Sequence, residues 1–600
     1  METWKTNLDE TKKRYIDWWN HKGIILNMWE HFQEGVKPHA DIPAPSPAKD
    51  LNQKWFDPQW RAEYLDWYVA HSSLKADILP VANTQLGPGS LAAILGGVFE
   101  GGEDTIWIHP DPDFNDEIVF NPEHPNWILH KELLKAGKAK ANGHSYVGMP
   151  DLMEGLDVLA ALKGTDKVLL DTVMQPEVLE QQMQQINDIY FKVFDELYDI
   201  IREGDEMAFC YFSSWAPGKM SKLQSDISTM ISEDDYRRFV QPFIREQCQK
   251  IDYTLYHLDG VGAMHHLPAL LEIEELNAIQ WTPGVGEPQG GSPKWYDLYK
   301  KILAGGKSIM ACWVTLDELK PLLDNIGADG VHLEMDFHNE REVEQAMRIV
   351  EEYSSSSSDV SKEDLLKEEA AATKQETIVV KDSAAAGNEA LKPLFNAIVD
   401  GKLEPAVEVP KKAIAEGVQP QEIINNYMIK AMGEVGQRFQ DGKAFVPQLL
   451  MAGRAMKGAL ELLKPLLQGS ASTTIGKVVI GTVKGDLHDI GKNLVASMLE
   501  GCGFEVINIG IDVSCDKFVE EVKKNKADIL CMSALLTTTM TYMQEVINAL
   551  EAAGIRHQVK VMIGGAPVSQ GFADEIGADG YSDNANTAVA VAKELMGLHK

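Results

Sequence analysis

The stretch Gly485-Asp486-Leu487-His488-Asp489-Ile490-Gly491 decides how the C-terminal part of this chain folds. It follows an apolar, β-branched run over residues 477–483 and precedes an amphipathic run over residues 492–500. The first run predicts a buried strand and the second predicts a helix. The stretch therefore lies on a strand-to-helix turn at the carboxyl edge of a parallel sheet, which is where open α/β sheets bind ligands.

Two further motifs follow this turn at the ends of later apolar runs. Residues 492–532 separate Gly491 from Ser533-Ala534-Leu535, and residues 536–563 separate Leu535 from Gly564-Gly565. The series D-x-H-x-x-G, S-x-L and G-G, in this order and spacing, resembles the corrinoid-binding domain of cobalamin-dependent methyltransferases and methionine synthase. An ordinary Rossmann-like turn with a capping aspartate and a surface histidine is the alternative interpretation.

The resemblance implies a cobalamin or other corrinoid cofactor and a role for each motif residue. His488 takes the place of the family histidine that becomes the lower axial ligand of cobalt. Asp486 matches the carboxylate that orients this histidine, and Thr539 matches the hydroxyl that extends the relay. The other motif residues assigned to corrinoid binding are Gly491, Ser533, Leu535, Gly564 and Gly565. The serine and the last two glycines would admit the displaced nucleotide tail between strand and helix.

Length, charge and cysteine content limit the number of domains, the classes of partner and the compartment that we expect for this chain. Six hundred residues predict several domains. A formal net charge of −34 argues against nucleic acid and anionic membranes as partners. The six cysteines include no C-x-x-C pair, which is typical of free thiols in a reducing compartment. The first residues have no apolar signal core and no run is long enough to span a bilayer, so we expect a cytoplasmic protein.

The first 353 residues alternate short apolar segments with longer segments of helical periodicity, for example Pro176 to Glu203. The segments expected as strands are Ile24 to Trp29, Ile78 to Asn83, Thr105 to His109, Ser145 to Met149, Met207 to Ser214, Tyr253 to Asp259, Ala278 to Thr282, Ser308 to Val314 and Gly330 to Met335. Repeated strand–helix units over this length predict an α/β fold of the (β/α)₈ TIM barrel type. The active site of such a barrel forms at the carboxyl ends of its strands.

Three phrases in this N-terminal region carry a second resemblance. They are Tyr146-Val147-Gly148-Met149-Pro150-Asp151-Leu152, Ile231-Ser232-Glu233-Asp234-Asp235-Tyr236-Arg237-Arg238-Phe239-Val240-Gln241-Pro242 and His257-Leu258-Asp259-Gly260. Residues 1–353 resemble the uroporphyrinogen decarboxylase (URO-D) superfamily, which also contains corrinoid and coenzyme M methyltransferases. A decarboxylase of this superfamily would need arginines near the first strand for its acidic substrate, and none occurs between Arg14 and Arg61.

The remaining chain divides into a linker, a helical segment and the corrinoid domain. Residues 354–387 are rich in Ser, Lys, Glu and Ala and lack aromatics, which predicts a flexible linker. Residues 388–468 predict a four-helix cap, and residues 469–600 predict a doubly wound, five-stranded parallel sheet. By the resemblance, Phe445 would cover the upper face of the corrinoid. Packing inside the bundle is the alternative role for Phe445.

The barrel site is less sharply predicted than the corrinoid motif. Family members that use a thiol acceptor bind zinc through an H-x-C motif and a distant cysteine, whereas this chain has Asp259 two residues after His257. Two alternatives remain open. His257, Cys312 and Glu334 could bind zinc, because all three lie at or near the ends of the last predicted strands. In a metal-free site, His257 or Glu334 could instead act as a general acid.

Aromatic residues are frequent at the predicted strand ends, namely Trp29, Tyr211, Trp215, Trp281 and Trp313. Such a lining could stack on a methoxylated ring or hold a quaternary ammonium group through cation–π contacts. Packing around the mouth of the barrel is the alternative role for each of these residues.

The two resemblances together imply a corrinoid-dependent methyltransferase. Its barrel would move a methyl group from a methoxyaromatic, methylamine or methyl halide to cobalt of its own corrinoid domain, for onward transfer to tetrahydrofolate or a thiol. A second methyltransferase and a reductive activator protein are the further partners that this implies. An acceptor-side methyltransferase and a non-enzymatic corrinoid carrier or sensor remain as alternatives.

The substitution His488→Ala tests the motif assignment. Because the resemblance makes His488 the lower axial ligand, we expect the variant to keep its fold but to lose lower-face cobalt coordination and methyl transfer. Visible absorption of the corrinoid-loaded protein measures the coordination. Spectra and turnover equal to those of the unaltered protein would contradict the assignment.

Overall fold

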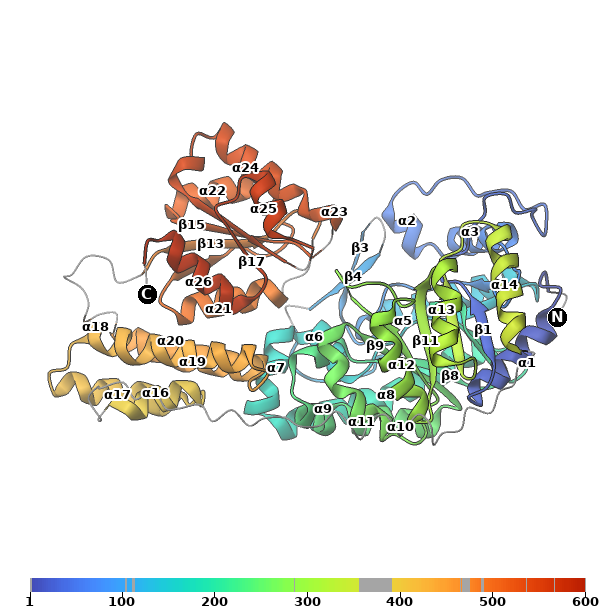
Figure 1. The fold of residues 1–600 in the computed structure, drawn as a ribbon, viewed down its shortest axis with the longest axis horizontal. Helices are drawn as coiled ribbons and strands as arrows, with labels where there is room; N and C mark the ends of the chain where they lie inside the picture. Colours follow the sequence, from blue (N-terminus) through green and yellow to red (C-terminus); the bar gives the residue numbers. More distant parts are fainter. Residues whose placement is uncertain are drawn as a thin grey trace. The chain divides into compact units, whose positions relative to one another are not determined.

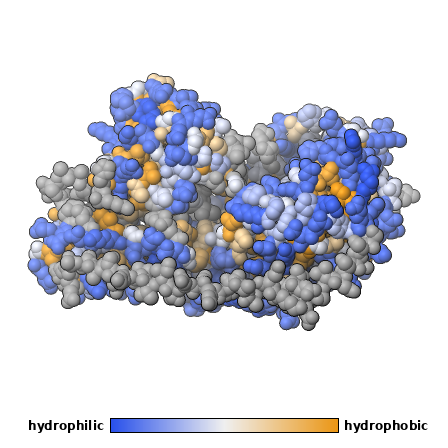
Figure 2. Space-filling model, in the orientation of Figure 1, coloured by the Kyte–Doolittle hydropathy of each residue, from blue (hydrophilic) through white to orange (hydrophobic). Residues whose placement is uncertain are grey.

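The structure is a computed structural model that describes residues 3–102, 105–110, 114–284, 286–354, 391–463, 466, 475–486, 490–535, 537–565 and 567–598. It divides into two compact units, Met1–Thr377 and Ile378–Lys600, which are treated separately below (Figure 1). The predicted linker 354–387 lies, except for Ser354, outside the described residues. Figure 2 shows largely hydrophilic surfaces, as the net charge of −34 leads us to expect.

The N-terminal unit is built on parallel strands that succeed one another along the chain. They are β1 (Ile24–Asn27), β2 (Val81–Ala82), β5 (Tyr146–Met149), β6 (Met207–Phe209), β8 (Met220–Gln224), β9 (Tyr253–Asp259), β10 (Ala278–Thr282), β11 (Ser308–Val314) and β12 (Val331–Met335). One sheet has the order β1-β12-β11-β10-β9-β8 and the other β2-β5-β6-β7, where β7 (Trp215–Ala216) is antiparallel to β6. The first strand of the unit thus pairs with the last.

Helices connect these strands, and most of them bury one face. They are α1 (Leu8–Trp19), α2 (Leu51–Phe56), α3 (Pro58–His71), α4 (Ser90–Ile94), α5 (Pro125–Ala141), α6 (Gly155–Lys163), α7 (Thr165–Met174), α8 (Pro176–Ile201), α9 (Glu233–Phe239), α10 (Gln241–Lys250), α11 (Leu267–Leu271), α12 (Tyr296–Ala304), α13 (Leu316–Ile326) and α14 (Glu340–Ser354). In α8, proline stands at the first helical position, where its missing N–H costs nothing. Its buried residues, which include Leu179, Met183, Ile186 and Tyr190, recur at the three- and four-residue spacing that was predicted.

Several parts of the strand prediction differ from the structure. The strand expected over Met207 to Ser214 ends at Phe209, because residues Tyr211–Ser213 form a 3₁₀ turn in which Phe212 has a φ of +57°. The segment expected at Thr105 to His109 forms β4 (Ile106–His109), which pairs antiparallel with β3 (Val98–Gly101) in a hairpin outside both parallel sheets. Strand β8 was not predicted, because the lysine in its sequence Met-Ser-Lys-Leu-Gln masks the apolar signal. Parallel hydrogen bonding to β9 over all five residues holds this segment in the strand conformation that its sequence does not predict. The predicted mixed α/β class with parallel sheets is confirmed.

The C-terminal unit begins with a helical bundle. Its helices are α16 (Lys392–Val399), α17 (Leu403–Ala415), α18 (Pro420–Ile423), α19 (Ile429–Gln440) and α20 (Val446–Leu463). A π-helical turn over Ile424–Met428 joins α18 to α19, so the third predicted helix contains one irregular turn. Buried bundle residues such as Met428 and Ala455 share one apolar core with Val478 and Ile480 of the following sheet. The bundle and the sheet therefore form a single packed body.

The sheet of this unit is parallel and five-stranded, as predicted. Its strands are β13 (Lys477–Thr482), β14 (Glu505–Asn508), β15 (Ile529–Ser533), β16 (Lys560–Gly564) and β17 (Gly580–Ser582), in the order β14-β13-β15-β16-β17. Helices α21 (Ile490–Gly501) and α26 (Ala585–Leu595) share a core with one face, and α22 (Cys515–Asn525), α24 (Tyr542–Ala552) and α25 (Gln570–Ile576) with the other (Figure 1). The short helix α23 (Thr537–Met540) precedes α24. Among the described residues, no helix is long and apolar enough to cross a bilayer.

The substitution Gly565→Ala tests why the G-G motif needs its second glycine. Gly565 has φ +131°, and a Cβ atom there would lie 1.8 Å from the carbonyl oxygen of Ala534. We therefore expect a loss of more than about 2 kcal/mol in the free energy of unfolding, measured by urea denaturation. Gly491→Ala is the matched control, since apart from its chain neighbours and the backbone of its own helix no heavy atom of the described residues lies within 4 Å of the added Cβ. Equal stability of the two variants would contradict this explanation.

Candidate functional site

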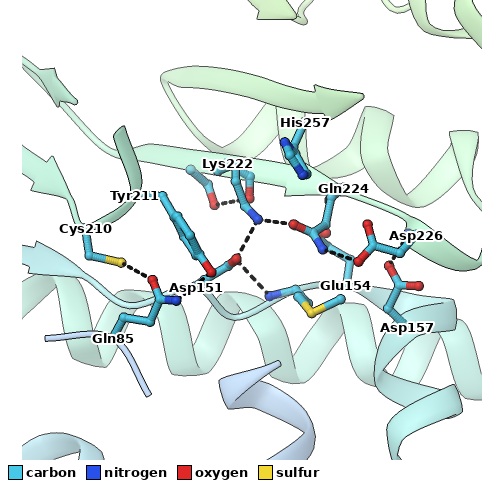
Figure 3. Close-up of polar contacts among 12 residues, drawn as sticks. Gln85, Asp151, Glu154, Asp157, Cys210, Tyr211, Lys222, Gln224, Asp226 and His257 are labelled. Carbon is cyan, nitrogen blue, oxygen red and sulfur yellow. Dashed lines mark hydrogen bonds and ion pairs between the residues drawn. The ribbon is translucent and has the colours of Figure 1, made fainter. Parts of the chain in front are cut away.

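A cluster of buried polar side chains lies at the carboxyl ends of β5, β8 and β9 in the N-terminal unit (Figure 3). The ammonium group of Lys222 in β8 donates to Asp151 Oδ2 at 2.5 Å and to the side-chain oxygen of Gln224. Asp151 is completely buried and Lys222 is 4% exposed. A buried lysine needs such partners, because an uncompensated charge in a protein interior is strongly destabilising. The pair therefore fixes β8 against the loop that follows β5.

His257 in β9 lies between two glutamines of the neighbouring strands. Parallel pairing places Gln224 of β8 and Gln280 of β10 beside it. The side-chain nitrogen of Gln280 donates to Thr282 Oγ1 at 2.8 Å and to Cys312 Sγ at 3.1 Å, so its oxygen faces His257 Nδ1. Nδ1 must then carry the proton and donate it to Gln280, which leaves Nε2 as the basic nitrogen. Burial lowers the pKa of His257 to about 3, with the charge of Lys222 as a smaller cause, so the ring is neutral.

Besides Asp151, four more carboxyl groups lie in this cluster, those of Glu154, Asp157, Asp226 and Asp259. Asp157 accepts hydrogen bonds from the backbone N–H groups of Asp226 at 2.8 Å and Ile227 at 2.9 Å, and Glu154 accepts one from Gln224 at 3.0 Å. Burial raises the pKa of Asp157 to about 6. Burial, and then the neighbouring charges of Asp157 and Asp259, raise the pKa of Asp226 well above its usual value. The site is therefore rich in carboxyl groups and short of positive charge.

Three of these residues could hold a metal ion. Among the described residues, Asp226, His257 and Asp259 form the group whose ligand atoms all lie within 4.8 Å of one another. Asp226 is exposed and the other two are half-buried, so the group can be reached from solvent. Two carboxylates and one imidazole leave coordination positions open, as catalytic zinc sites do. The same groups could equally accept a proton or balance the charge of an organic cation.

The structure does not gather the zinc set expected from His257, Cys312 and Glu334. Gln280 stands between His257 and Cys312 and hydrogen-bonds both. Glu334 lies opposite Cys312 in the register of β11 and β12, but it pairs with His332 at 2.8 Å and accepts a hydrogen bond from Asn27 at 3.1 Å. Both Cys312 and Glu334 are at most 1% exposed, and burial raises both pKa values. Neither residue is part of the solvent-accessible group around His257.

Sequence reasoning identified His257 and Asp259 but missed Asp151, Lys222 and Asp226. Lys222 lies on the strand that was not predicted, and Asp226 begins the 3₁₀ turn directly after that strand. Asp151 was part of a quoted phrase but had no assigned role.

A second polar group lies at the carboxyl edge of the C-terminal sheet. Asp486 follows β13, is completely buried, and accepts hydrogen bonds from Thr539 Oγ1 and from the backbone N–H of Leu535, both at 2.7 Å. The predicted relay from Asp486 to Thr539 is thus present, and the leucine of the S-x-L motif contributes its backbone. Ser533 lies opposite Gly564 in the register of β15 and β16.

The remaining corrinoid residues lie as follows. His488 is outside the described residues, in the segment 487–489 that directly follows Asp486. Gly491 is in the first turn of α21. Phe445 is half-buried just before α20, and its backbone N–H donates to the side-chain oxygen of Gln448 at 2.9 Å. It is thus more exposed than Leu449, which is buried in the core of the bundle.

Comparison with known proteins agrees with this arrangement. Models of the B12-binding domain match residues 476–590 and 390–464. The chain is 47% identical over 209 residues to dimethylamine corrinoid protein 1 of Methanosarcina acetivorans, covering 35% of this chain and 98% of that protein. It is 44% identical over 214 residues to trimethylamine corrinoid protein 2 of Methanosarcina mazei, covering 35% of this chain and 98% of that protein.

Solved structures also match about a third of the chain. The methanol:cobalamin methyltransferase complex of Methanosarcina barkeri is 32% identical with a TM-score of 0.32, covering 36% of this chain and 81% of that one. A cobalamin-binding protein from Desulfitobacterium hafniense is 37% identical with a TM-score of 0.30, covering 34% of this chain and 98% of that one. With its B12-binding domains and its identity to whole methylamine corrinoid proteins, this chain belongs to the corrinoid protein family of cobalamin-dependent methyltransferase systems.

Proposed function

We propose that this chain is a methyltransferase with its own carrier, which moves a methyl group from a small methylated donor to the corrinoid of its C-terminal unit. The observation that carries this proposal is that one chain combines a corrinoid domain with a solvent-accessible group at the carboxyl ends of parallel strands, Asp226, His257 and Asp259. An acceptor such as tetrahydrofolate or a thiol would then take the methyl group. A second methyltransferase and a reductive activator protein complete the proposed set of partners.

The fold of the N-terminal unit supports this function. We propose that its two sheets form one (β/α)₈-type barrel of the URO-D superfamily. The pairing of β1 with β12 supports closure, because it joins the first strand of the unit to the last. The polar cluster lies where active sites of such barrels form, at the carboxyl ends of the strands.

The C-terminal unit fits a corrinoid whose cobalt takes a histidine as lower ligand. A ligating imidazole needs an acceptor for its other N–H, and Asp486 is held in place by Thr539 and Leu535 directly before the segment that contains His488. A bound corrinoid supplies a cobalt nucleophile that can accept a methyl group. Asp486 and His488 would hold the lower face of the corrinoid, and Phe445 of the cap would shield its upper face.

The barrel residues supply positioning and charge. Gln280 fixes the tautomer of His257, so that Nε2 presents a lone pair to whatever binds beside Asp226 and Asp259. Zinc bound by Asp226, His257 and Asp259, in place of the expected set with Cys312 and Glu334, is the alternative role of this group. A carrier without its own methyl-transfer activity is the second candidate, because the similar proteins named above are themselves corrinoid proteins.

The substitution Thr539→Val tests the relay. It removes one of the hydrogen bonds that Asp486 accepts, so we expect the free energy of unfolding to fall by about 1–2 kcal/mol and the visible spectrum of the bound corrinoid to shift. Thr539→Ser keeps the hydroxyl and serves as the control. If the valine variant matched the unaltered protein in stability and spectrum, the relay would have no role in cobalt coordination.

The substitution His257→Ala tests the barrel site. The full-length, corrinoid-loaded and reduced protein receives methoxyaromatics, methylamines, betaines or methyl halides one at a time. With the effective donor, we expect the variant to lose cobalt(I) absorption at least about 100-fold more slowly than the unaltered protein, while its corrinoid stays bound. His557→Ala removes an exposed histidine and is the control. Equal rates in the His257→Ala variant and the unaltered protein would place the methyl-transfer site elsewhere.

A further inference from the structure

Aromatic rings from three strand ends meet beside the carboxyl cluster. Trp29 follows β1, Tyr211 and Phe212 follow β6, and Trp313 lies in β11. Trp29 stacks on Trp313, with ring centroids 5.2 Å apart and planes 14° apart, and meets Tyr211 edge-on at 5.6 Å. Phe212 contacts Trp29 at 4.6 Å and lies 6.2 Å from the ring of His257. The aromatic group and the group around His257 are therefore continuous.

The structure separates accessible rings from core rings. Trp29, Tyr211 and Trp313 are half-buried, so part of each ring remains open to a ligand. Trp215 and Trp281, which also stand at predicted strand ends, are 2% and 0% exposed and belong to the core. Trp313 and Phe212 have φ values of +53° and +57°. Such backbone strain costs about 1–3 kcal/mol per residue and is concentrated at functional sites.

The charges next to these rings favour a positively charged ligand. Lys222 is the cation of the cluster, and its ammonium group is already shared by Asp151 and Gln224 and lies 4.9 Å above the ring of Tyr211. This contact shows that an aromatic face of the site accepts an alkylammonium group. Asp226 is exposed and Asp259 half-buried, and no lysine or arginine among the described residues forms an ion pair with either of them. Burial raises the pKa values of both carboxyl groups, so a cation bound between them would favour their ionised form, whereas a carboxylated donor would oppose it. The ring faces would attract the same cation.

Building on the proposed function, we propose that the methyl donor of this site is a quaternary methylammonium compound. Its positive group would pack against Trp29 and Trp313, and Asp226 and Asp259 would balance its charge. Cation–π contacts of this kind are the usual means of recognising quaternary ammonium groups.

The chemistry of methyl transfer agrees with this class of donor. In such a transfer the bond between the methyl carbon and nitrogen would break with its electron pair staying on nitrogen, and a bound, reduced corrinoid would supply the electron pair that takes up the methyl group. The departing group is a neutral tertiary amine, so no proton and no Lewis acid is required. The product has lost the charge that attracted the donor to the carboxylates and rings, which favours its release.

Direct binding to the full-length protein tests the inference independently of turnover. Choline is the cationic probe, and 3,3-dimethylbutan-1-ol, in which carbon replaces nitrogen, is the neutral probe of the same shape. We expect choline to quench tryptophan fluorescence and to bind at least about tenfold more tightly than the alcohol. Trp313→Leu and Asp259→Asn should each weaken choline binding by at least about fivefold, and Trp313→Phe, which keeps a ring, should restore most of it.

Trp60→Leu is the matched control, because Trp60 is also half-buried and stacked on a ring, that of Tyr64, but lies in α3. Equal affinity for choline and the alcohol, or choline affinity unchanged by Trp313→Leu, would overturn the inference. So would a divalent metal ion that copurifies with Asp226, His257 and Asp259 and prevents choline binding. Methyl transfer from another donor class without choline binding would refute this inference but keep the proposed function. Choline binding without transfer from any donor would refute the proposed function alone.

Discussion

Buried polar side chains in the N-terminal unit need hydrogen-bond partners, and this requirement fixes how the side chains of its candidate site are arranged. Its parallel strands place Gln224, His257 and Gln280 side by side, and each strand carries a polar group into a water-poor interior. Hydrogen bonds through Gln280 connect His257 to Cys312, and Lys222 joins the same region to Asp151. Because an unpaired buried group costs about 1–3 kcal/mol, this network leaves each side chain one low-energy arrangement. The tautomer of His257 follows from it.

The corrinoid domain also contains a buried polar group that is held by hydrogen bonds. Asp486 is buried at the carboxyl edge of its sheet. It accepts hydrogen bonds from the hydroxyl of Thr539 and the backbone N–H of Leu535, which both follow the neighbouring strand β15 in sequence. A carboxylate held in this way can orient an imidazole that binds cobalt. The chain therefore joins two preorganised edges, one that we propose binds the corrinoid and one that we propose binds the methyl donor.

The corrinoid edge could be predicted from sequence because its residues occur in short motifs at fixed spacing. Asp486, Thr539 and Gly565 are all where the motif series places them. The barrel site could be predicted only in part. His257 and Asp259 lie on a strongly apolar strand, whereas Lys222 interrupts its own strand and hides it. The separation of Cys312 from His257 depends on Gln280, a contact between strands that no local pattern encodes.

The most direct test of the central claim compares the full-length protein with residues 391–600 purified alone, both loaded with corrinoid and reduced. The measured quantity is the rate at which the cobalt(I) absorption disappears after a methyl donor is added. The account predicts rapid loss in the full-length protein and at least about 100-fold slower loss in the C-terminal unit, with recovery when residues 1–354 are added back. Equal rates for the two proteins would show that the N-terminal unit does not deliver the methyl group.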